Sequence, residues 1–210
     1  MYYNRQRSEL LRYIQSRQNR VLEVGCAEGL LGESLKQQGL AAEVTGIELF
    51  PDAARVAETR LDRVICGDIE SMDRDGMGLE PGSFDCIICG DVLEHLRDPW
   101  AVLSWLASRL KPGGKLIASI PNVRYWSVVF PLLFRGEWRY QSQGILDRTH
   151  LRFFTKTTAM QLLEQSGLTV TQSEPMLYRK IDRAGMFLSF GLLAGLFAFQ
   201  WVVVGSKNNS

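Results

Sequence analysis

The length, composition and charge of the chain are those of an ordinary globular protein. Its 210 residues suffice for one α/β domain with a substantial core, and 46% hydrophobic with 22% charged residues is a typical composition. The net charge of +1 gives no reason to expect a nucleic-acid partner. The polar and basic start predicts no signal peptide, so we expect one cytoplasmic domain over residues 1–210.

Short apolar runs and helical patterns alternate along the chain. A short amphipathic helix over residues 8–14 leads into the first apolar run. The runs that predict strands are 21–24, 43–48, 63–66, 84–89 and 115–120, and the predicted helices that follow are 30–38, 52–61, 99–110 and 156–166. Because a strand recurs after each helix, we expect a parallel, doubly wound α/β sheet.

The fourth of these strands carries Cys86 and Cys89 in a C-x-x-C pattern. Residues three apart in a strand point to opposite faces, so these two sulfurs cannot easily share a zinc ion or a disulfide. We expect free thiols in a reducing cytoplasm.

The C-terminal stretch from Ala184 to Ser206 has no charged residue and is long enough for a transmembrane window. Glycines and a serine interrupt its first half, and its second half is aromatic and β-branched. We therefore expect an apolar helix or loop over Met186 to Leu196 and then a buried strand, with a membrane span as the alternative.

The first strand ends in a glycine turn that has the features of a ligand site. Glu23, Gly25 and Gly29 lie between an apolar run and a helical pattern. Glycines permit backbone conformations closed to other residues and a close approach of ligand to main chain. The spacing is G-x-x-x-G and lacks the G-x-G-x-x-G fingerprint that holds a pyrophosphate. A carboxylate repels phosphate and attracts an amine, so the expected ligand is cationic and phosphate-free.

The loops after the predicted strands begin at Gly25, Glu48, Asp68, Gly90 and Pro121, and each of them carries polar or glycine residues. Ligands of doubly wound sheets bind beyond the carboxyl ends of the strands, where these loops begin. Glu48 also lies about twenty residues after the glycine turn, where nucleotide folds place the acid that binds ribose hydroxyls.

This set of residues resembles the pattern of the class I S-adenosylmethionine-dependent methyltransferases, and the match covers most of the chain. The resemblance implies a Rossmann-like, seven-stranded, mostly parallel sheet in the order 3-2-1-4-5-7-6. Strand six would be 170–175, strand seven would be antiparallel over 197–206, and helices would cover both faces. It also implies S-adenosyl-L-methionine as the cofactor and S-adenosyl-L-homocysteine as the product.

The resemblance assigns roles to residues at the strand ends. Glu48 would accept the ribose hydroxyls, Asp68 and Ile69 would meet the adenine, and Gly90 with Asp91 would meet the methionine part. His95 would line the cofactor pocket or hold its loop. The full set of expected cofactor residues is Glu23, Gly25, Cys26, Gly29, Glu48, Leu49, Asp68, Ile69, Gly90, Asp91 and His95.

Residues 144–155 are similar to a segment of bacterial methyltransferase-domain families related to quinone-type O-methyltransferases or to cell-surface polysaccharide synthesis. The expected reaction is O-methylation of a small-molecule, quinone-like or glycan- or lipid-linked acceptor. The alternatives are an N- or C-methyltransferase, a non-catalytic S-adenosylmethionine-binding module, and a nicotinamide-dependent dehydrogenase, against which the missing fingerprint argues.

A hydroxyl acceptor needs a base, and His150 is the candidate general base. The alternative is that Asp147, Arg148 and His150 form a hydrogen-bonded brace. No carboxylate cluster suggests a metal, so we expect none.

Residues 123–150, termed the cover segment, are predicted to cover the acceptor. Aromatic residues and arginines alternate there, and the expected acceptor contacts are Tyr125, Trp126, Arg148 and His150. Such a surface suits an aromatic or lipid-linked acceptor and peripheral contact with the inner membrane face. The alternative is a lid packed against the core.

Overall fold

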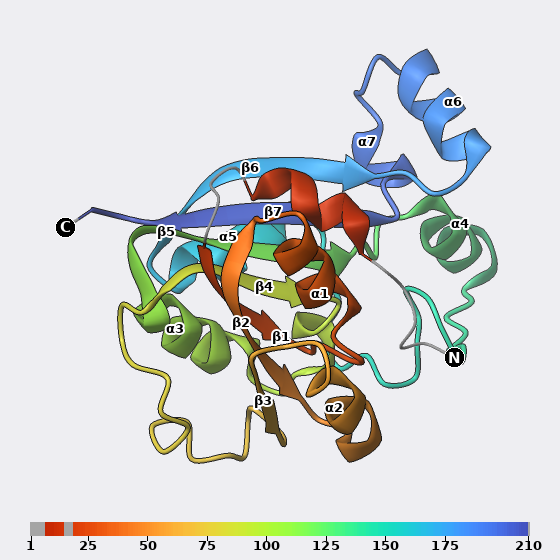
Figure 1. Cartoon of the computed structure of the whole chain (residues 1–210). Helices are drawn as coiled ribbons and strands as arrows, with labels where there is room; N and C mark the ends of the chain where they lie inside the picture. Colours follow the sequence, from red (N-terminus) through yellow and green to blue (C-terminus); the bar gives the residue numbers. More distant parts are fainter. Residues whose placement is uncertain (1–6, 15–18, 210) are drawn as a thin grey trace.

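A single twisted sheet forms the centre of the protein, as the computed structural model in Figure 1 shows for residues 7–14 and 19–209. Its strand order is β3-β2-β1-β4-β5-β7-β6. The strands are β1 (Asn19–Val24), β2 (Ala41–Glu48), β3 (Arg63–Cys66), β4 (Phe84–Gly90), β5 (Leu110–Pro121), β6 (Leu168–Met176) and β7 (Gln200–Lys207). β7 runs antiparallel to both β5 and β6, and the other pairs are parallel. The predicted order and the antiparallel seventh strand are confirmed.

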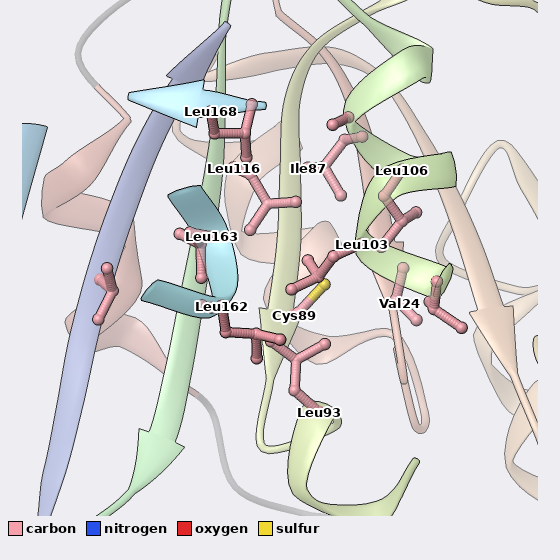
Figure 2. Close-up of a cluster of buried hydrophobic side chains, with 14 of the residues drawn as sticks. Val24, Ile87, Cys89, Leu93, Leu103, Leu106, Leu116, Leu162, Leu163 and Leu168 are labelled. Carbon is pink, nitrogen blue, oxygen red and sulfur yellow. The ribbon is translucent and has the colours of Figure 1, made fainter. Parts of the chain in front are cut away.

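Helices cover both faces of this sheet. The α-helices are α1 (Leu30–Gln37), α2 (Pro51–Ala57), α3 (Pro99–Arg109), α4 (Trp126–Arg135), α5 (Lys156–Gln165), α6 (Lys180–Leu188) and α7 (Ala194–Phe197), and the 3-10 helices are η1 (Ser8–Tyr13) and η2 (Leu93–His95). One apolar cluster joins α3 and α5 to one face (Figure 2), and a second joins η1 and α1 to the other. Cys89 belongs to the first cluster and Cys86 to the second, which confirms that their side chains lie on opposite faces.

Local structure departs from the sequence prediction mainly at the start of the fifth strand. β5 begins at Leu110, which pairs with Phe84, so the Pro112–Gly114 turn lies inside the strand. The pairing register shifts between Phe84 and Cys86, and Gly113 takes φ +74°, so a bulge absorbs the extra residues. The short helix predicted over residues 8–14 is present as the 3-10 helix η1 (Ser8–Tyr13).

The C-terminal stretch is divided between two short helices and a strand. Residues 200–207 form β7, which confirms that the aromatic and β-branched half is a buried strand. The apolar half forms the end of α6, a turn and α7, between β6 and β7. Within the described residues, every helix is too short or too polar to cross a membrane.

The parallel strands end at the edge of the sheet where α4 lies, and the connection through α6 and α7 extends beyond the same edge (Figure 1). The cover segment contributes α4 and an irregular stretch to it. The loops that the sequence singled out therefore open toward one side of the molecule.

Candidate active site

The glycine turn after β1 adopts a backbone that requires glycine. Gly25 has φ +68° and Gly29 has φ +80°. A Cβ on Gly25 would lie 2.6 Å from Cγ2 of Val92, and one on Gly29 would lie 3.2 Å from the Ala57 backbone. The Gly25 amide donates to the carbonyl of Ile47 on the adjacent strand (2.8 Å), which fixes the turn against β2. The turn is therefore a rigid cradle with an open main chain.

Glu23 lies buried beneath this turn, with 5% of its surface exposed. It accepts a hydrogen bond from the Gly32 amide, but its Oε2 atom is buried without a partner. Burial raises the pKa of the carboxyl to about 8. Glu23 lines a small cavity of about 40 Å³ together with Arg7, Gly25, Cys26, Ala27, Leu30, Leu31, Ile88 and Gly90. An unpartnered acid under a glycine-lined opening fits the ammonium end of a cofactor.

Glu48 ties the first two cofactor loops together. Its Oε2 accepts a hydrogen bond from the Ala27 amide (2.8 Å) and its Oε1 accepts one from the Phe50 amide (2.9 Å). The carboxylate is buried at the end of β2, where each oxygen retains a lone pair for a diol. Leu49 beside it is 52% exposed, whereas the Cys26 side chain packs in the core against Gly46. At this edge of the sheet, a ligand could therefore meet the backbone of Cys26 and the apolar side chain of Leu49.

Asp68 and Ile69 follow β3 but differ in exposure. The Oδ1 atom of Asp68 accepts from the Glu70 amide (2.9 Å), and the side chain is half-buried. Ile69 is 5% exposed and packs in the α3 cluster, so it does not face the open edge as expected for a residue against adenine. The exposed apolar side chains that follow β2 are Leu49 and Phe50.

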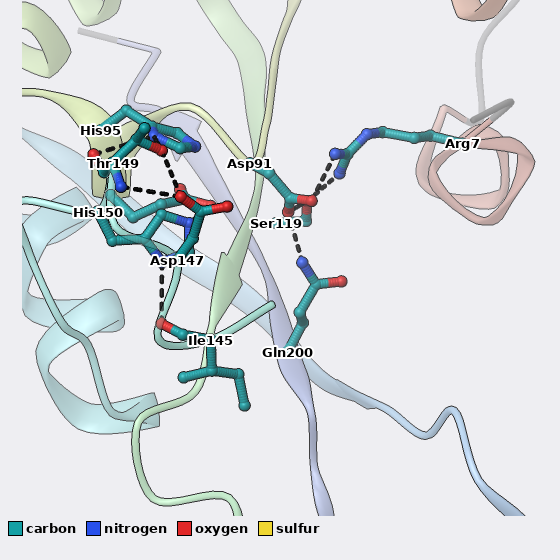
Figure 3. Close-up of polar contacts among 10 residues, drawn as sticks. Arg7, Asp91, His95, Ser119, Ile145, Asp147, Thr149, His150 and Gln200 are labelled. Carbon is teal, nitrogen blue, oxygen red and sulfur yellow. Dashed lines mark hydrogen bonds and ion pairs between the residues drawn. The ribbon is translucent and has the colours of Figure 1, made fainter. Parts of the chain in front are cut away.

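Asp91, directly after β4, is held in a network that the sequence did not reveal. Its φ is +53°, and its carboxylate pairs with Arg7 and accepts from the Ser119 hydroxyl (2.9 Å) and the Gln200 amide (Figure 3). Arg7 also donates to Ser119 (3.0 Å) and lies over Gly90, where a Cβ would meet its Cδ at 3.0 Å. Asp91 therefore positions Arg7 over the cavity.

Arg7 could not be identified from the sequence, because it lies in a polar segment next to other basic residues and belongs to no motif. Its pKa is raised by Asp91 despite the opposing effect of burial. A permanently charged guanidinium on the cavity wall suits a carboxylate ligand. Arg7 and Glu23 thus line one cavity, which they provide with a cation and an ionisable acid.

A second polar group surrounds His95 and His150 (Figure 3). The two rings pack edge to face with centroids 4.7 Å apart. His150 is buried, its Nδ1 lies 2.9 Å from the Ile145 carbonyl, and its Nε2 lies 4.0 Å from Oε1 of Glu94. Because Nδ1–H must donate to that carbonyl, Nε2 carries the lone pair. His95 is partly exposed, and burial together with His150 lowers its pKa.

Glu94 is the most deeply buried acid of this group, with 1% of its surface exposed. Neither carboxyl oxygen has a partner in another residue of the described chain, and burial raises its pKa well above the ordinary value. Donor atoms of Glu94, His95 and His150 lie within 4.8 Å of one another, a spacing and ligand set compatible with a divalent metal. This cluster is not visible in the sequence, because Glu94 and His95 are neighbours whereas His150 lies far along the chain.

The expected brace around His150 exists in a different form. Asp147 accepts hydrogen bonds from the amide (2.8 Å) and hydroxyl (2.7 Å) of Thr149. Thr149 in turn lies 3.1 Å from Nδ1 of His95. Arg148 is exposed, with its amide bonded to the Gln141 carbonyl. The brace therefore runs through Thr149 to His95, and the side chains of His150 and Arg148 lie outside it.

The expected acceptor contacts Tyr125 and Trp126 are instead anchors for α6. Tyr125 is completely buried, and its hydroxyl donates to Oδ1 of Asp182 (2.7 Å). The indole N–H of Trp126 donates to the same oxygen (3.1 Å). Burial raises the pKa of Tyr125 to about 12. The sequence missed Asp182, which carries the only negative charge between β6 and β7. Tyr125 thus cannot touch an acceptor in this arrangement.

Trp126 has a second surface on a groove of about 340 Å³ along α4. The groove is lined by Trp126, Ser127, Phe130, Pro131, Phe134 and Arg135. An apolar wall with one arginine at its side matches the aromatic and basic pattern expected of the cover segment.

Sequence comparison assigns the chain to a family. Residues 2–173 match the family described as "Methyltransferase domain", so the chain belongs to that family. Together with the sheet order, this makes it a member of the class I S-adenosylmethionine-dependent methyltransferases and rules against the dehydrogenase alternative.

The chain is similar to two curated proteins called ubiquinone biosynthesis O-methyltransferase. It is 42% identical over 160 residues to that of Xanthomonas euvesicatoria pv. vesicatoria, a match covering 71% of this chain and 65% of the relative. It is 34% identical to that of Xanthomonas campestris pv. campestris strain B100, with the same shares covered. The match thus spans about two thirds of the length of these relatives, 65% in each case.

Solved structures share the fold at low sequence identity. A SAM-dependent methyltransferase from Archaeoglobus fulgidus has a TM-score of 0.71 at 20% identity, covering 95% of this chain and 92% of that one. A possible histamine N-methyltransferase from Thermotoga maritima has a TM-score of 0.67 at 19% identity, covering 95% and 86%. A protein titled as a 4+2 cyclase has a TM-score of 0.63 at 16% identity, covering 94% of this chain and 78% of that one. The fold alone therefore does not fix the reaction.

Proposed function

We propose that the chain is an S-adenosylmethionine-dependent O-methyltransferase that acts on a hydroxyl of an apolar, quinone-like acceptor in the cytoplasm. The observation that carries the proposal is the pair of buried acids, Glu23 and Glu48, beneath a glycine turn whose backbone is open. When bound, the cofactor supplies a methyl group already activated by its sulfonium charge. The protein has to orient the two reactants, exclude water and take up a proton.

The residues at the strand ends would divide the cofactor between them. Glu23 would bind the amino group and Arg7 the carboxylate, because a cation and an ionisable acid line the same cavity. Glu48 would accept the ribose hydroxyls, Asp68 the adenine amine, and Leu49 would cover the ring. Asp91 would act through Arg7, as a positioning residue.

His150 is proposed as the general base, with Glu94 as its proton partner. Nε2 of His150 carries the lone pair and lies 4.0 Å from Oε1 of Glu94. Burial raises the pKa of Glu94, so its carboxyl favours the neutral form beside the ring. An acceptor hydroxyl placed beside Nε2 would lose its proton to the ring.

The acceptor class follows from the groove along α4 and from the relatives. The groove is apolar, and two similar proteins are named as ubiquinone biosynthesis O-methyltransferases. An aromatic ring with an apolar substituent would place the substituent against Phe130 and Phe134. Arg135 would remain at the rim.

The test is methyl transfer to a dihydroxybenzene with a hydrophobic side chain, followed by release of S-adenosylhomocysteine. Turnover should fall at least a hundredfold in His150→Ala, while cofactor affinity stays within threefold of the parent. Unchanged turnover in His150→Ala would contradict its role as general base. Cofactor binding with no turnover on any hydroxyl, amine or carbon acceptor would favour the non-catalytic binding module.

A further inference from the structure

The connection between β6 and β7 ends in a projecting apolar tip. The tip comprises residues 187–193, where α6 ends and the chain turns toward α7. Phe190 is 92% exposed, Leu192 88%, Phe187 79% and Leu188 75%. Figure 1 shows α6 projecting from the body of the protein, beyond the edge where the parallel strands end. Several large apolar side chains exposed side by side mark a surface that meets a partner.

The backbone of the tip is strained at Phe190, its most exposed side chain. Phe190 has φ +48°, a conformation that a bulky residue rarely adopts, and Gly191 follows with φ +79°. Strain of this kind persists where the surrounding structure imposes it and is concentrated at functional segments. The exposed position of Phe190 is thus built into the turn.

The base of the connection is firmly fixed to the cover segment. Asp182 binds the hydroxyl of Tyr125 and the indole of Trp126, and Asn122 donates to the carbonyls of Gly195 (2.8 Å) and Ala198 (2.7 Å). α6 packs closely on α7, because a Cβ at Gly185 would lie 2.3 Å from the Phe197 ring. A tip on a rigid base presents its apolar side chains continuously.

The charge around the tip indicates what it meets. Arg179, Lys180 and Arg183 are exposed on α6 or at its start, whereas the only acid of the connection, Asp182, is fully buried. α7 contacts α4, whose exposed residues include Leu133, Phe134 and Arg135. Apolar side chains flanked by cations fit the interface of an anionic bilayer. A symmetric contact between two copies would place like charges opposite one another.

We propose that residues 187–193 insert into the interfacial region of a membrane that contains anionic lipids, with Lys180 and Arg183 at the headgroups. This surface lies outside the residues that match the family, which end at residue 173. It would bring the groove of α4 to a membrane-dissolved acceptor, but the insertion itself is independent of methyl transfer. It is therefore measured without cofactor or acceptor.

The experiment is flotation of the full chain with vesicles of phosphatidylcholine alone or with phosphatidylglycerol. The parent should bind the anionic vesicles, and Phe190→Ser with Leu192→Ser should weaken binding more than tenfold. Val56→Ser, an exposed apolar residue on α2 far from the tip, should bind as the parent does. Lys180→Glu and Arg183→Glu should each weaken binding by about fivefold or more. Unchanged thermal melting would show that these variants are folded.

A second measurement places the tip in the bilayer directly. Phe190→Trp should show stronger quenching by brominated acyl chains than the parent, which retains only its native tryptophans. The proposal is overturned if the parent ignores anionic vesicles, or if the double serine variant binds them as well as the parent. It is also overturned if sedimentation reveals a dimer that the double variant abolishes, because a second copy would then cover the tip.

Discussion

At the scale of single residues, Glu23 links cofactor binding to pH. Its pKa of about 8 in the folded protein means that the carboxyl is largely protonated at neutral pH. A bound ammonium favours the ionised form, so binding should release a proton. Affinity for S-adenosylhomocysteine should therefore rise between pH 6 and about 8, and calorimetry in buffers of different ionisation enthalpy should detect the proton. Glu23→Gln should bind weakly at every pH, without this rise.

The same acid should cost the fold stability as pH rises. The folded-state pKa lies above the ordinary value of 4.5, so between that value and about 8 the folded chain holds more protons than the unfolded chain. The loss of folding stability caused by Glu23 is therefore smallest in acid, and it grows as pH rises from 4.5 to about 8. Glu23→Gln removes it, and its melting temperature should exceed that of the parent by several degrees at pH 8 but not at pH 4.5. Equal differences at both pH values would contradict the buried, unpaired state of Glu23.

Two glycines with the same backbone conformation make a matched pair. Gly25 and Gly39 both have φ +68°, but an added Cβ meets Val92 at 2.6 Å only at Gly25. Gly39→Ala should cost about 1 kcal/mol for the backbone alone. Gly25→Ala should cost more in unfolding free energy and should also abolish cofactor binding, because the cradle must shift. Similar losses in both variants, measured by denaturation and calorimetry, would show that the steric contact does not matter.

At the scale of elements, Asp182 should hold the α6–α7 connection to the cover segment. Its two oxygens accept from Tyr125, Trp126 and the Arg179 amide, and the side chain is fully buried. Asp182→Ala leaves these three donors, including the buried Tyr125 hydroxyl, without their acceptor and should destabilise by about 2–4 kcal/mol. Hydrogen exchange should accelerate in α6 before the sheet is affected.

The control for this change is Asp52→Ala on α2, whose carboxylate is 94% exposed and pairs with Arg55. Exposed pairs of this kind contribute about 0–1 kcal/mol, so stability and exchange should be nearly unchanged. A uniform increase in exchange throughout Asp182→Ala would contradict a local anchoring role.

At the scale of the whole molecule, periodic patterns made the sheet predictable. The apolar runs at 21–24, 43–48 and 84–89 became central strands, because strands buried on both faces read as continuous apolar segments. The seventh strand followed from the aromatic and β-branched residues around Val202, even within an uncharged stretch. Strand ends then located the loops of the candidate site.

Contacts between distant residues were not predictable. Arg7 reaches Asp91 and Ser119, 84 and 112 residues away, and Tyr125 reaches Asp182, 57 residues away. Local patterns carry no information about such pairings, since each partner alone resembles an ordinary surface charge or core aromatic. For this reason Tyr125 was assigned to the acceptor, and the grouping of Glu94 with His150 was missed.

The central claim is that the carboxyl edge of this sheet binds a phosphate-free, cationic nucleoside through Glu23, Glu48 and Asp68. Isothermal titration calorimetry of the folded full chain with S-adenosylhomocysteine tests it most directly, with Glu48→Ala as the variant and NAD as the competing ligand. We predict saturable binding at one site per chain, loss of more than tenfold in affinity for Glu48→Ala, and no uptake of NAD. Absence of binding heat and of any thermal stabilisation by S-adenosylhomocysteine in well-folded protein would contradict the account.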